Sequence, residues 1–337
     1  MNESSQPADA DFSALCDWRD LHADAFDGTR CLITGGAGFI GSHLAHALVT
    51  LGAEVVLLDD LSGGSRDNVP PGCRLVEGCI RDHDAVALAM DRAELVFHLA
   101  ALGSVPRSIT MPAVYTDINI GGTMRVLEVA RQSGVRRLVL ASSSSVYGET
   151  PELPKHESMP MLALSPYAAS KIACEALVRS YAKCYDIDTA CLRFFNVFGP
   201  RQNANSAYAA VIAAFGKALA DGKSPIVYDD GEQSRDFTFV ENVVHANLLA
   251  ARSSQPIDGA AVNVACGRRV TVNELAKRMM QSFGHGDLSI DYRPARTGDI
   301  RHSLASLDRA SELLGYEPVV DFEAGLDATV RWMRSEG

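Results

Sequence analysis

The chain has 337 residues with 42 acidic and 31 basic side chains, which give a formal net charge of −11 at pH 7. The sequence has no basic run that would release counterions from a phosphate backbone, and this argues against nucleic acid or an anionic membrane as a partner. Hydrophobic residues make up 47% of the chain, which is enough for a substantial core in one large domain or two closely packed ones.

The cysteines and the absence of long apolar runs indicate a reduced, cytoplasmic protein. No apolar segment approaches the ~20 residues of a membrane span, and the acidic, polar N-terminus has no signal-peptide core. The eight cysteines show no metal-type spacing, and several lie in apolar stretches where free thiols pack as small hydrophobic groups. His245 and the other histidines also lack metal spacing, so we predict no metal site.

Short apolar strands alternate with helical stretches from Arg30 onward. Residues 1–28 show no clear periodicity, and we interpret them as an N-terminal extension that caps the domain through a short helix and carries no chemistry. The first helix is expected at about 39–51, and the strands are expected at 31–34, 54–58, 74–77, 95–99, 137–142 and 189–194. This alternation predicts an α/β fold with a doubly wound parallel sheet.

The glycine-rich segment from Thr34 to Gly41 follows the first predicted strand and opens the first predicted helix. In this context glycines let the backbone approach a pyrophosphate at a helix N-terminus. Asp59 ends the second strand 24 residues after Gly35, where a carboxylate accepts hydrogen bonds from an adenosine ribose and repels a 2′-phosphate. The segment therefore predicts a Rossmann-type dinucleotide site that prefers NAD over NADP; the alternative is a tight turn beside a solvated aspartate.

After Asn196 the rhythm breaks into loops and short elements, returns to a strand near 261–264, and breaks again. We therefore divide the chain into the extension 1–28, a Rossmann domain over 29–196 completed by about 237–266, and a smaller lobe. This lobe is non-contiguous and combines residues 197–236 with residues 267–337, and we expect it to bind the substrate.

Tyr167 and Lys171 stand four residues apart, so on a helix they share one face and the ammonium lies close to the phenol. Free tyrosine is a poor base at neutral pH, and a nearby cation favours the phenolate. A run of serines from Ser142 to Ser145 precedes this pair; alone, such a run at a strand end is more typical of a turn. Together with the glycine turn, these residues predict hydride removal from a carbinol carbon while the phenol takes the hydroxyl proton.

The glycine spacing, Ser143, Tyr167 and Lys171 together resemble the extended short-chain dehydrogenase/reductase family, and the likeness extends from about residue 29 to the end of the chain. The chain is most similar to the NAD-dependent UDP-hexose 4-epimerases, especially the UDP-N-acetylglucosamine branch. This closer match is carried by the stretches ALGSVPRSI (101–109), SAYAAVI (206–212) and GDIRHS (298–303). The resemblance implies reversible oxidation at C4, in which hydride passes to tightly bound NAD and returns to the opposite face of a 4-keto sugar.

The resemblance also implies the catalytic roles. Tyr167 would be the acid/base, Lys171 would orient the nicotinamide ribose and polarise the tyrosine, and Ser143 would hydrogen-bond the sugar 4-oxygen. Ser143 is selected because the family's catalytic serine or threonine lies four residues before a tyrosine, here Tyr147. Ser144 is expected to assist.

The serine run also lacks groups that related enzymes carry. Related 4,6-dehydratases place Asp-Glu where Ser144 and Ser145 stand, and UDP-glucuronate decarboxylases and GDP-mannose dehydratases keep a Glu at the position of Ser145. Elimination of water needs that acid/base pair. Epimerisation is the chemistry that remains.

The resemblance implies a cofactor site with one departure. The family usually has an aspartate that receives the adenine amine where this chain has Cys79, which puts one hydrogen bond to NAD in question. Asn119 is expected to support local backbone geometry. The cofactor-binding set is Gly35, Gly38, Phe39, Ile40, Gly41, Asp59, Ile80, Ala100, Asn119, Tyr167 and Lys171.

UDP must be anchored firmly while the hexose turns over, and cations with planar forks suit its phosphates. Arg235 and Arg296 match the family's diphosphate-binding arginines, although either alone could be a surface ion pair. Tyr228 matches the residue that stacks on uracil, and Asn196 would contact the phosphates or the sugar.

The resemblance implies that three further residues contact or select the sugar. Ser104 and Gln202 align with hexose-contacting positions of the N-acetyl-preferring branch. Ser303 matches a gate where a tyrosine excludes the N-acetyl group and a small residue admits it. The predicted substrates are therefore UDP-GlcNAc and UDP-GalNAc, with lower activity on UDP-glucose and UDP-galactose.

Three alternatives remain open. The first is a UDP-glucuronate 4-epimerase, in which Arg107 would serve the carboxylate. The second is another NAD(P)-dependent nucleotide-sugar oxidoreductase, such as a one-way reductase. The third is a catalytically silent NAD-binding scaffold, which would typically have lost the tyrosine or the lysine. The helices after Pro112 and Tyr167 form a dimer seam in relatives, so the resemblance also implies a homodimer.

Overall fold

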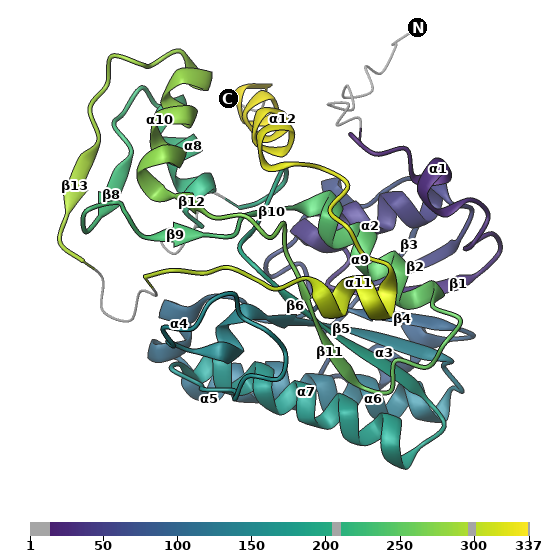
Figure 1. Cartoon of the computed structure of the whole chain (residues 1–337). Coiled ribbons are helices and arrows are strands. Elements are labelled where there is room, and N and C mark those ends of the chain that lie inside the picture. The colour runs from purple at the N-terminus through teal and green to yellow at the C-terminus, as the bar shows by residue number, and fades with distance from the viewer. Residues whose placement is uncertain (1–13, 204–209, 296–300, 336–337) are drawn as a thin grey trace, which may run out of the picture.

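The computed structural model describes residues 14–203, 210–295 and 301–335. A seven-stranded parallel sheet with the order β11-β6-β5-β4-β1-β2-β3 runs through the larger part of the molecule (Figure 1). Its strands are β1 (Arg30–Thr34), β2 (Glu54–Asp59), β3 (Arg74–Glu77), β4 (Leu95–His98), β5 (Arg137–Ser143), β6 (Asp188–Phe194) and β11 (Ala260–Val264). Every neighbouring pair is parallel. The predicted Rossmann-type sheet is confirmed.

Alternate residues of the strands feed two apolar layers. Ile33 and Leu57 pack into one layer, while their neighbours Leu32 and Leu58 pack into the other. The first layer is covered by α2 (Phe39–Thr50), α9 (Val240–Arg252) and α11 (Asp308–Leu314); the second is covered by α3 (His83–Met90), α6 (Gly122–Gln132) and α7 (Pro166–Cys184). Because both faces are buried, the strands read as continuous apolar runs.

The smaller lobe is assembled from segments that lie far apart in the sequence. Its helices α8 (Val211–Ala220), α10 (Val272–Phe283) and α12 (Phe322–Ser335) share an apolar cluster. The parallel pair β8 (Ile226–Tyr228) with β13 (Asp291–Arg293) and the antiparallel pair β9 (Ser234–Arg235) with β12 (Val270–Thr271) lie beside them (Figure 1). The parallel pair β7 (Val197–Phe198) with β10 (Thr238–Phe239) is a further two-stranded sheet, and its Phe198 and Phe239 belong to the same apolar cluster. Segments from separate stretches of the chain thus share one apolar cluster.

Two segments of the chain attach to the layer formed by α2 and α9. The short helix expected in the N-terminal extension is α1 (Trp18–His22), and both Trp18 and Phe26 are buried in this layer. The α11 segment, which the sequence assigns to the lobe, also packs here through Ala310 and Leu314.

The connection between β4 and α6 contains α4 (Val105–Thr110), α5 (Pro112–Tyr115) and a π-helical segment (Thr116–Gly121). Two 3-10 turns, Arg66–Asn68 and Ser144–Tyr147, complete the regular elements of the described residues. No helix among these residues is long and apolar enough to cross a membrane.

Candidate active site

The parallel sheet brings most of the predicted residues to one edge. The glycine turn follows β1, Asp59 ends β2, Ser143 ends β5 and Asn196 follows β6, so all four lie at carboxyl ends of strands. The strand order reverses between β1 and β4, next to the glycine turn. Ligands of doubly wound folds bind at this edge, where the order reverses.

The glycine turn fits a pyrophosphate because it excludes side chains and leaves a helix end uncapped. Gly35 has a φ of +71°, and a Cβ there would lie 2.9 Å from the backbone nitrogen of Ala100. A Cβ on Gly41 would overlap the carbonyl oxygen of Gly35. Gly38 is the N-cap of α2 and offers no side-chain acceptor to the N–H groups of the first turn, which includes Phe39 and Ile40. Such a helix end favours an anion.

Asp59 ties the glycine turn to the end of β2. Its Oδ2 accepts a hydrogen bond from the backbone nitrogen of Ala37 at 3.0 Å, and its Oδ1 accepts one from that of Leu61 at 2.8 Å. Burial raises the pKa of Asp59, and these backbone donors oppose the rise. Each carboxylate oxygen has a further lone pair that can accept from a ribose hydroxyl.

The adenine side of the predicted cofactor site contains the departure from the family pattern. Cys79 is half-buried, and its Sγ accepts a hydrogen bond from Nε of Arg81 at 3.3 Å. Arg81 also pairs with Asp117 at 2.5 Å. Ile80 is buried with its side chain directed at Gly122, and the backbone nitrogen of Ala100 donates to Thr34 Oγ1 at 3.2 Å.

Helix α7 begins where the sequence places a capping residue and a proline. Ser165 is the N-cap and accepts from the backbone nitrogen of Ala168 at 3.1 Å, and Pro166 follows it. Tyr167 is then half-buried near the helix start, while Lys171 is only 5% exposed. The Lys171 ammonium donates to the carbonyl oxygen of Ala141 on β5 at 2.7 Å. The side chains of Tyr167 and Lys171 thus lie on one helix face beside the end of β5.

Tyr115 and Asn119 connect the start of α7 to the loop that contains Ser104. The ring of Tyr115 meets that of Tyr167 edge to face, with 6.4 Å between centroids, and its hydroxyl accepts from the backbone nitrogen of Ser104 at 3.2 Å. Asn119 bonds both backbone groups of Leu102, at 2.9 Å and 3.2 Å, and donates to Ser170 Oγ at 2.9 Å.

Ser142 and Ser143 have different partners, as alternate residues of a strand must. Ser142 donates to the Glu175 carboxylate at 2.5 Å, inside the core. Ser143 Oγ accepts from the backbone nitrogen of Ser145 at 3.2 Å and so caps the turn that begins with Ser144. Since the Ser143 hydroxyl accepts in this bond, its hydrogen remains able to donate to another group.

A buried ion pair links the elements that lie next to the serine run. Arg193 of β6 donates to both oxygens of Glu175 on α7, at 2.9 Å and 2.7 Å. Its guanidinium lies 4.8 Å from the ring centroid of Tyr147, and the Tyr147 hydroxyl donates to Asn263 on β11 at 2.6 Å. The pair holds α7, β6 and the serine turn together.

Three of the predicted substrate-binding residues lie on segments that are linked by hydrogen bonds. Asn196 Nδ2 donates to the carbonyl oxygen of Asp236 at 3.2 Å. Arg235, the residue before Asp236, donates to the carbonyl oxygens of Ser234 and Arg301 at 3.0 Å and 3.3 Å. The backbone nitrogen of Ser303 donates to Ser234 O at 3.0 Å. Asn196, Arg235 and Ser303 therefore lie on adjoining segments.

Tyr228, Gln202 and Arg296 are placed differently. Tyr228 is the last residue of β8, which pairs with β13 apart from the other segments. Its carbonyl oxygen accepts from Gln233 Nε2 at 2.7 Å. Gln202 donates to Val197 O at 2.9 Å, and its side-chain oxygen is buried without a hydrogen-bond partner among the described residues. Arg296 lies outside the described residues, as do 206–209 and 298–300 of the motif stretches.

Sequence reasoning missed three buried groups at this edge: His98, Tyr115 and Asp236. Tyr115 contacts the ring of Tyr167, and His98 lies between Thr34 of the glycine turn and Thr123 of α6. Asp236 could have been found from its position directly after Arg235. No local sequence pattern indicated that Tyr115 or His98 belongs to the site.

The fold and the site define a dinucleotide-dependent enzyme of the extended short-chain dehydrogenase/reductase class, with a serine, a tyrosine and a lysine at the carboxyl edge of a Rossmann sheet. The chain belongs to the NAD dependent epimerase/dehydratase family, whose sequence profile matches residues 31–265. This membership confirms the predicted family resemblance and NAD as the cofactor.

Three similar proteins are named as UDP-sugar epimerases. The UDP-glucose 4-epimerase of Mycolicibacterium smegmatis is 38% identical over 91% of this chain and 99% of its own. The structure of UDP-N-acetylglucosamine 4-epimerase from Methanobrevibacter ruminantium M1 in complex with UDP-N-acetylmuramic acid is 38% identical, with a TM-score of 0.88 over 93% of this chain and 100% of that one. The Thermus thermophilus UDP-glucose 4-epimerase complex with NAD is 34% identical, with a TM-score of 0.84 over 92% and 100%.

Proposed function

We propose that this chain catalyses the reversible 4-epimerisation of UDP-GlcNAc and UDP-GalNAc, with lower activity on UDP-glucose and UDP-galactose. The observation that carries the reaction type is the serine turn at the end of β5. Residues 143–145 offer only hydroxyl groups, and the Ser145 hydroxyl is buried without a hydrogen-bond partner among the described residues. Neither Ser144 nor Ser145 can replace the acid/base pair that dehydration requires.

In this proposal the residues of the site divide the work at C4. NAD, when bound, supplies the hydride acceptor, and Tyr167 takes the proton from the 4-hydroxyl group. The buried ammonium of Lys171 lies on the same helix face as Tyr167 and would bind a hydroxyl group of the nicotinamide ribose. Ser143 donates its free hydroxyl hydrogen to the sugar 4-oxygen and holds it beside the phenol. Inversion would be completed when the 4-keto sugar has turned over, so that the hydride returns to the opposite face of C4 while Tyr167 gives its proton back to the 4-oxygen.

The smaller lobe would anchor UDP. Arg235 and Arg296 are proposed for the diphosphate, Tyr228 for uracil, and Asn196 for the phosphates or the sugar. Ser104, Ser144, Gln202 and Ser303 are proposed around the hexose. The buried, unpartnered side-chain oxygen of Gln202 supports this assignment, because a sugar hydroxyl would satisfy it.

The choice of the N-acetylated sugars rests on the small side chain of Ser303 and on the likeness to a UDP-N-acetylglucosamine 4-epimerase. UDP-glucuronate is the second candidate. Arg107 is exposed on α4, three residues from Ser104, where a guanidinium could bind a uronate carboxylate.

The test is to incubate the purified protein separately with UDP-GlcNAc, UDP-glucose and UDP-glucuronate and to resolve the epimers by chromatography. We expect UDP-GalNAc to form fastest, with no net change of absorbance at about 340 nm because the cofactor is regenerated. Stoichiometric consumption of NADPH would identify a reductase instead. A protein that binds NAD but converts none of the three would be a scaffold.

We also infer a cytoplasmic homodimer. The dimer would form through α5, α6 and α7, and Val114 and Met124 are exposed apolar side chains on the first two of these elements. All eight cysteines are free thiols, which is consistent with a reducing compartment. Light scattering after size exclusion would report the mass of a dimer, and a monomer would contradict this inference.

A further inference from the structure

Asp236 is a fully buried carboxylate directly after Arg235. Its Oδ1 accepts from the backbone nitrogen of Cys266 at 3.0 Å, and its Oδ2 accepts from those of Gly267 and Ala305 at 3.1 Å and 3.2 Å. Its own carbonyl oxygen accepts from the side chain of Asn196 at 3.2 Å. One residue thus joins the end of β9, the turn after β11, the segment at 305 and the loop after β6.

Three of the proposed substrate-binding residues, Asn196, Arg235 and Ser303, lie on or next to these four segments. Arg235 precedes Asp236 in the chain, and Asn196 bonds to it directly. Ser303 stands two residues before Ala305, and its backbone nitrogen donates to Ser234 at 3.0 Å. Any movement of the Asp236 carboxylate relative to its donors would therefore shift Arg235 and Ser303 against each other.

Main-chain donors, rather than a paired cation, stabilise this carboxylate. Burial raises the pKa of Asp236 to about 6, and the backbone N–H groups of Ala305, Cys266, Gly267 and Arg268 act in the opposite direction. Backbone donors have fixed positions, whereas a cation on a flexible side chain could follow a displaced carboxylate. The contacts of Asp236 therefore set the geometry of the turn.

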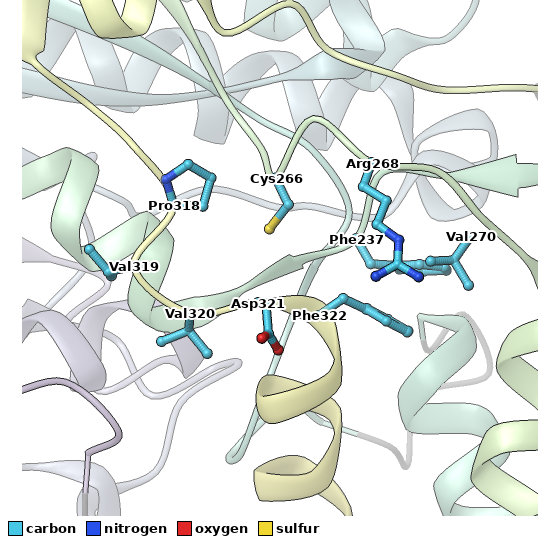
Figure 2. A pocket seen from close by; sticks show the side chains of 9 residues that line it. All are labelled: Phe237, Cys266, Arg268, Val270, Pro318, Val319, Val320, Asp321 and Phe322. Carbon is cyan, nitrogen blue, oxygen red and sulfur yellow. The ribbon is translucent and has the colours of Figure 1, made fainter.

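Open space lies on the far side of this turn. A cavity of about 340 Å³ is lined by Cys266 and Arg268 of the turn and by residues 318–322, together with Phe237 and Val270. Figure 2 shows Cys266 and Arg268 across the cavity from Val320 and Asp321. Packing against the turn is incomplete on this side. The bonds to Asp236 therefore contribute to its position, together with the bond from Asn242 to Cys266 Sγ at 3.4 Å and the bond from the Tyr316 hydroxyl to Ala265 O at 2.9 Å.

We propose that Asp236 is a positioning residue, which holds Arg235, Asn196 and Ser303 in the arrangement that binds the nucleoside diphosphate part of the substrate. This role rests on the proposed function of the lobe. Asp236 itself touches backbone and not ligand, so it acts through its neighbours.

Asp236→Asn tests this role at nearly constant volume. The carboxamide replaces one acceptor oxygen by an NH₂ group, which then faces backbone N–H donors that it cannot satisfy. We expect the Kd for UDP, measured by calorimetry, and the KM for the UDP-sugar to rise about tenfold, while kcat changes by less than about threefold. The amount of NAD that copurifies should stay unchanged, because the glycine turn lies at another strand.

Glu241→Gln is the matched control. Glu241 is also buried, and its carboxylate accepts from the backbone nitrogens of Leu15 and Cys16 at 3.0 Å and 2.9 Å. The chemical change is identical, but it loosens the N-terminal segment instead of the substrate lobe. We expect its UDP affinity to equal that of the parent. If both variants lost UDP affinity to the same extent, the effect would be general destabilisation and the positioning role would be overturned.

A milder variant serves if Asp236→Asn does not accumulate as folded protein. Gly267 has a φ of +71°, so Gly267→Ala strains the same turn while Asp236 stays intact. We expect about a threefold loss of UDP affinity with kcat retained. Parent-like UDP binding in the variant that folds would overturn the positioning role alone, whereas a parent protein that fails to bind UDP would contradict the proposed function.

Discussion

The ammonium nitrogen of Lys171 lies 6.0 Å from the centroid of the Tyr167 ring and donates to Ala141 O at 2.7 Å. The backbone of β5 therefore holds the cation beside the phenol instead of leaving it to the side chain's own flexibility. Because Lys171 is buried, water screens its charge little, and its field at the phenol is stronger than that of a surface lysine. This relationship makes separate predictions for the two residues.

Tyr167→Phe should reduce epimer formation by about 10² to 10⁴-fold, the usual contribution of a positioned acid/base. The variant removes only the hydroxyl group, so the edge-to-face contact with Tyr115 and the NAD content should persist. The measurement is the rate of epimer formation at saturating UDP-sugar. Tyr185→Phe, at the exposed C-terminal end of the same helix, should keep the parental rate. A Tyr167→Phe protein as fast as the parent would rule out the proposed mechanism.

Lys171→Met keeps the length of the side chain and removes its charge. We expect a loss of about 10²-fold or more in kcat, together with weaker retention of NAD, because the ammonium places a positive charge beside the reacting phenol and is proposed to bind the nicotinamide ribose. Turnover and the NAD released on denaturation would both be measured. Lys183→Met, in the exposed last turn of α7, is the control and should change neither. Unchanged NAD content in Lys171→Met would separate the two assigned roles.

Ser303→Tyr tests the gate. The backbone nitrogen of Ser303 is fixed to Ser234, so a tyrosine there would project its ring from a held position beside β9. We expect the ratio of kcat/KM for UDP-GlcNAc to that for UDP-glucose to fall about tenfold or more, because the ring occupies the space of the acetamido group. Ser303→Thr keeps a small side chain and should preserve the ratio. An equal loss on both sugars would contradict the gate.

The sheet and the cofactor turn could be predicted from local sequence. The predicted strands match those of the structure to within one residue at each end, because strands buried on both faces appear as short apolar runs bounded by turn residues. Asp59 and Ser143 each directly follow a predicted strand, and the carboxyl ends of parallel strands meet at one edge, so both could be placed there; the choice of Ser143 within the serine run came from the family resemblance. Ser165 and Pro166 begin the helix of Tyr167 in the structure, and they are a local signal that the prediction did not use.

The supporting contacts could not be predicted in this way. Asp236 bonds to backbone groups 30 and 69 positions away, and backbone donors leave no mark in the side-chain sequence. The Glu175 and Arg193 pair depends on the register of α7 against β6. Tyr115 immediately precedes a π-helical segment, and helical periodicity of 3.6 residues does not describe such a segment.

His98 makes a prediction for the pH dependence of stability. Its Nδ1 bonds to Thr34 Oγ1 at 2.7 Å and its Nε2 to Thr123 Oγ1 at 2.9 Å. Burial, with a smaller contribution from Lys171, lowers the pKa of His98 from its ordinary 6.5 to about 3. The unfolded chain therefore binds a proton below pH 6.5 that the native protein does not, and the stability that His98 contributes above this pH is lost as the pH falls.

His98→Gln should remove this dependence. The difference in free energy of unfolding between parent and variant should shrink by about 1.4 kcal/mol between about pH 7.5 and about pH 5.5, in favour of the variant at the lower pH. Urea unfolding at the two pH values measures it. A difference that stayed constant would mean that His98 takes up a proton in the native state.

Trp18→Ala tests whether the N-terminal segment stabilises the fold without taking part in the reaction. Trp18 is 5% exposed and packs with Phe26 into the layer under α2 and α9. Loss of such a side chain should cost about 3 kcal/mol or more in free energy of unfolding, because the cavity is only partly refilled. The rate of epimer formation at a temperature where the variant is folded should equal that of the parent. Leu15→Ala, whose side chain is exposed, should change stability by less than about 0.5 kcal/mol. A folded Trp18→Ala protein with reduced kcat would show instead that this segment influences the active site through α2, the helix that begins at the glycine turn.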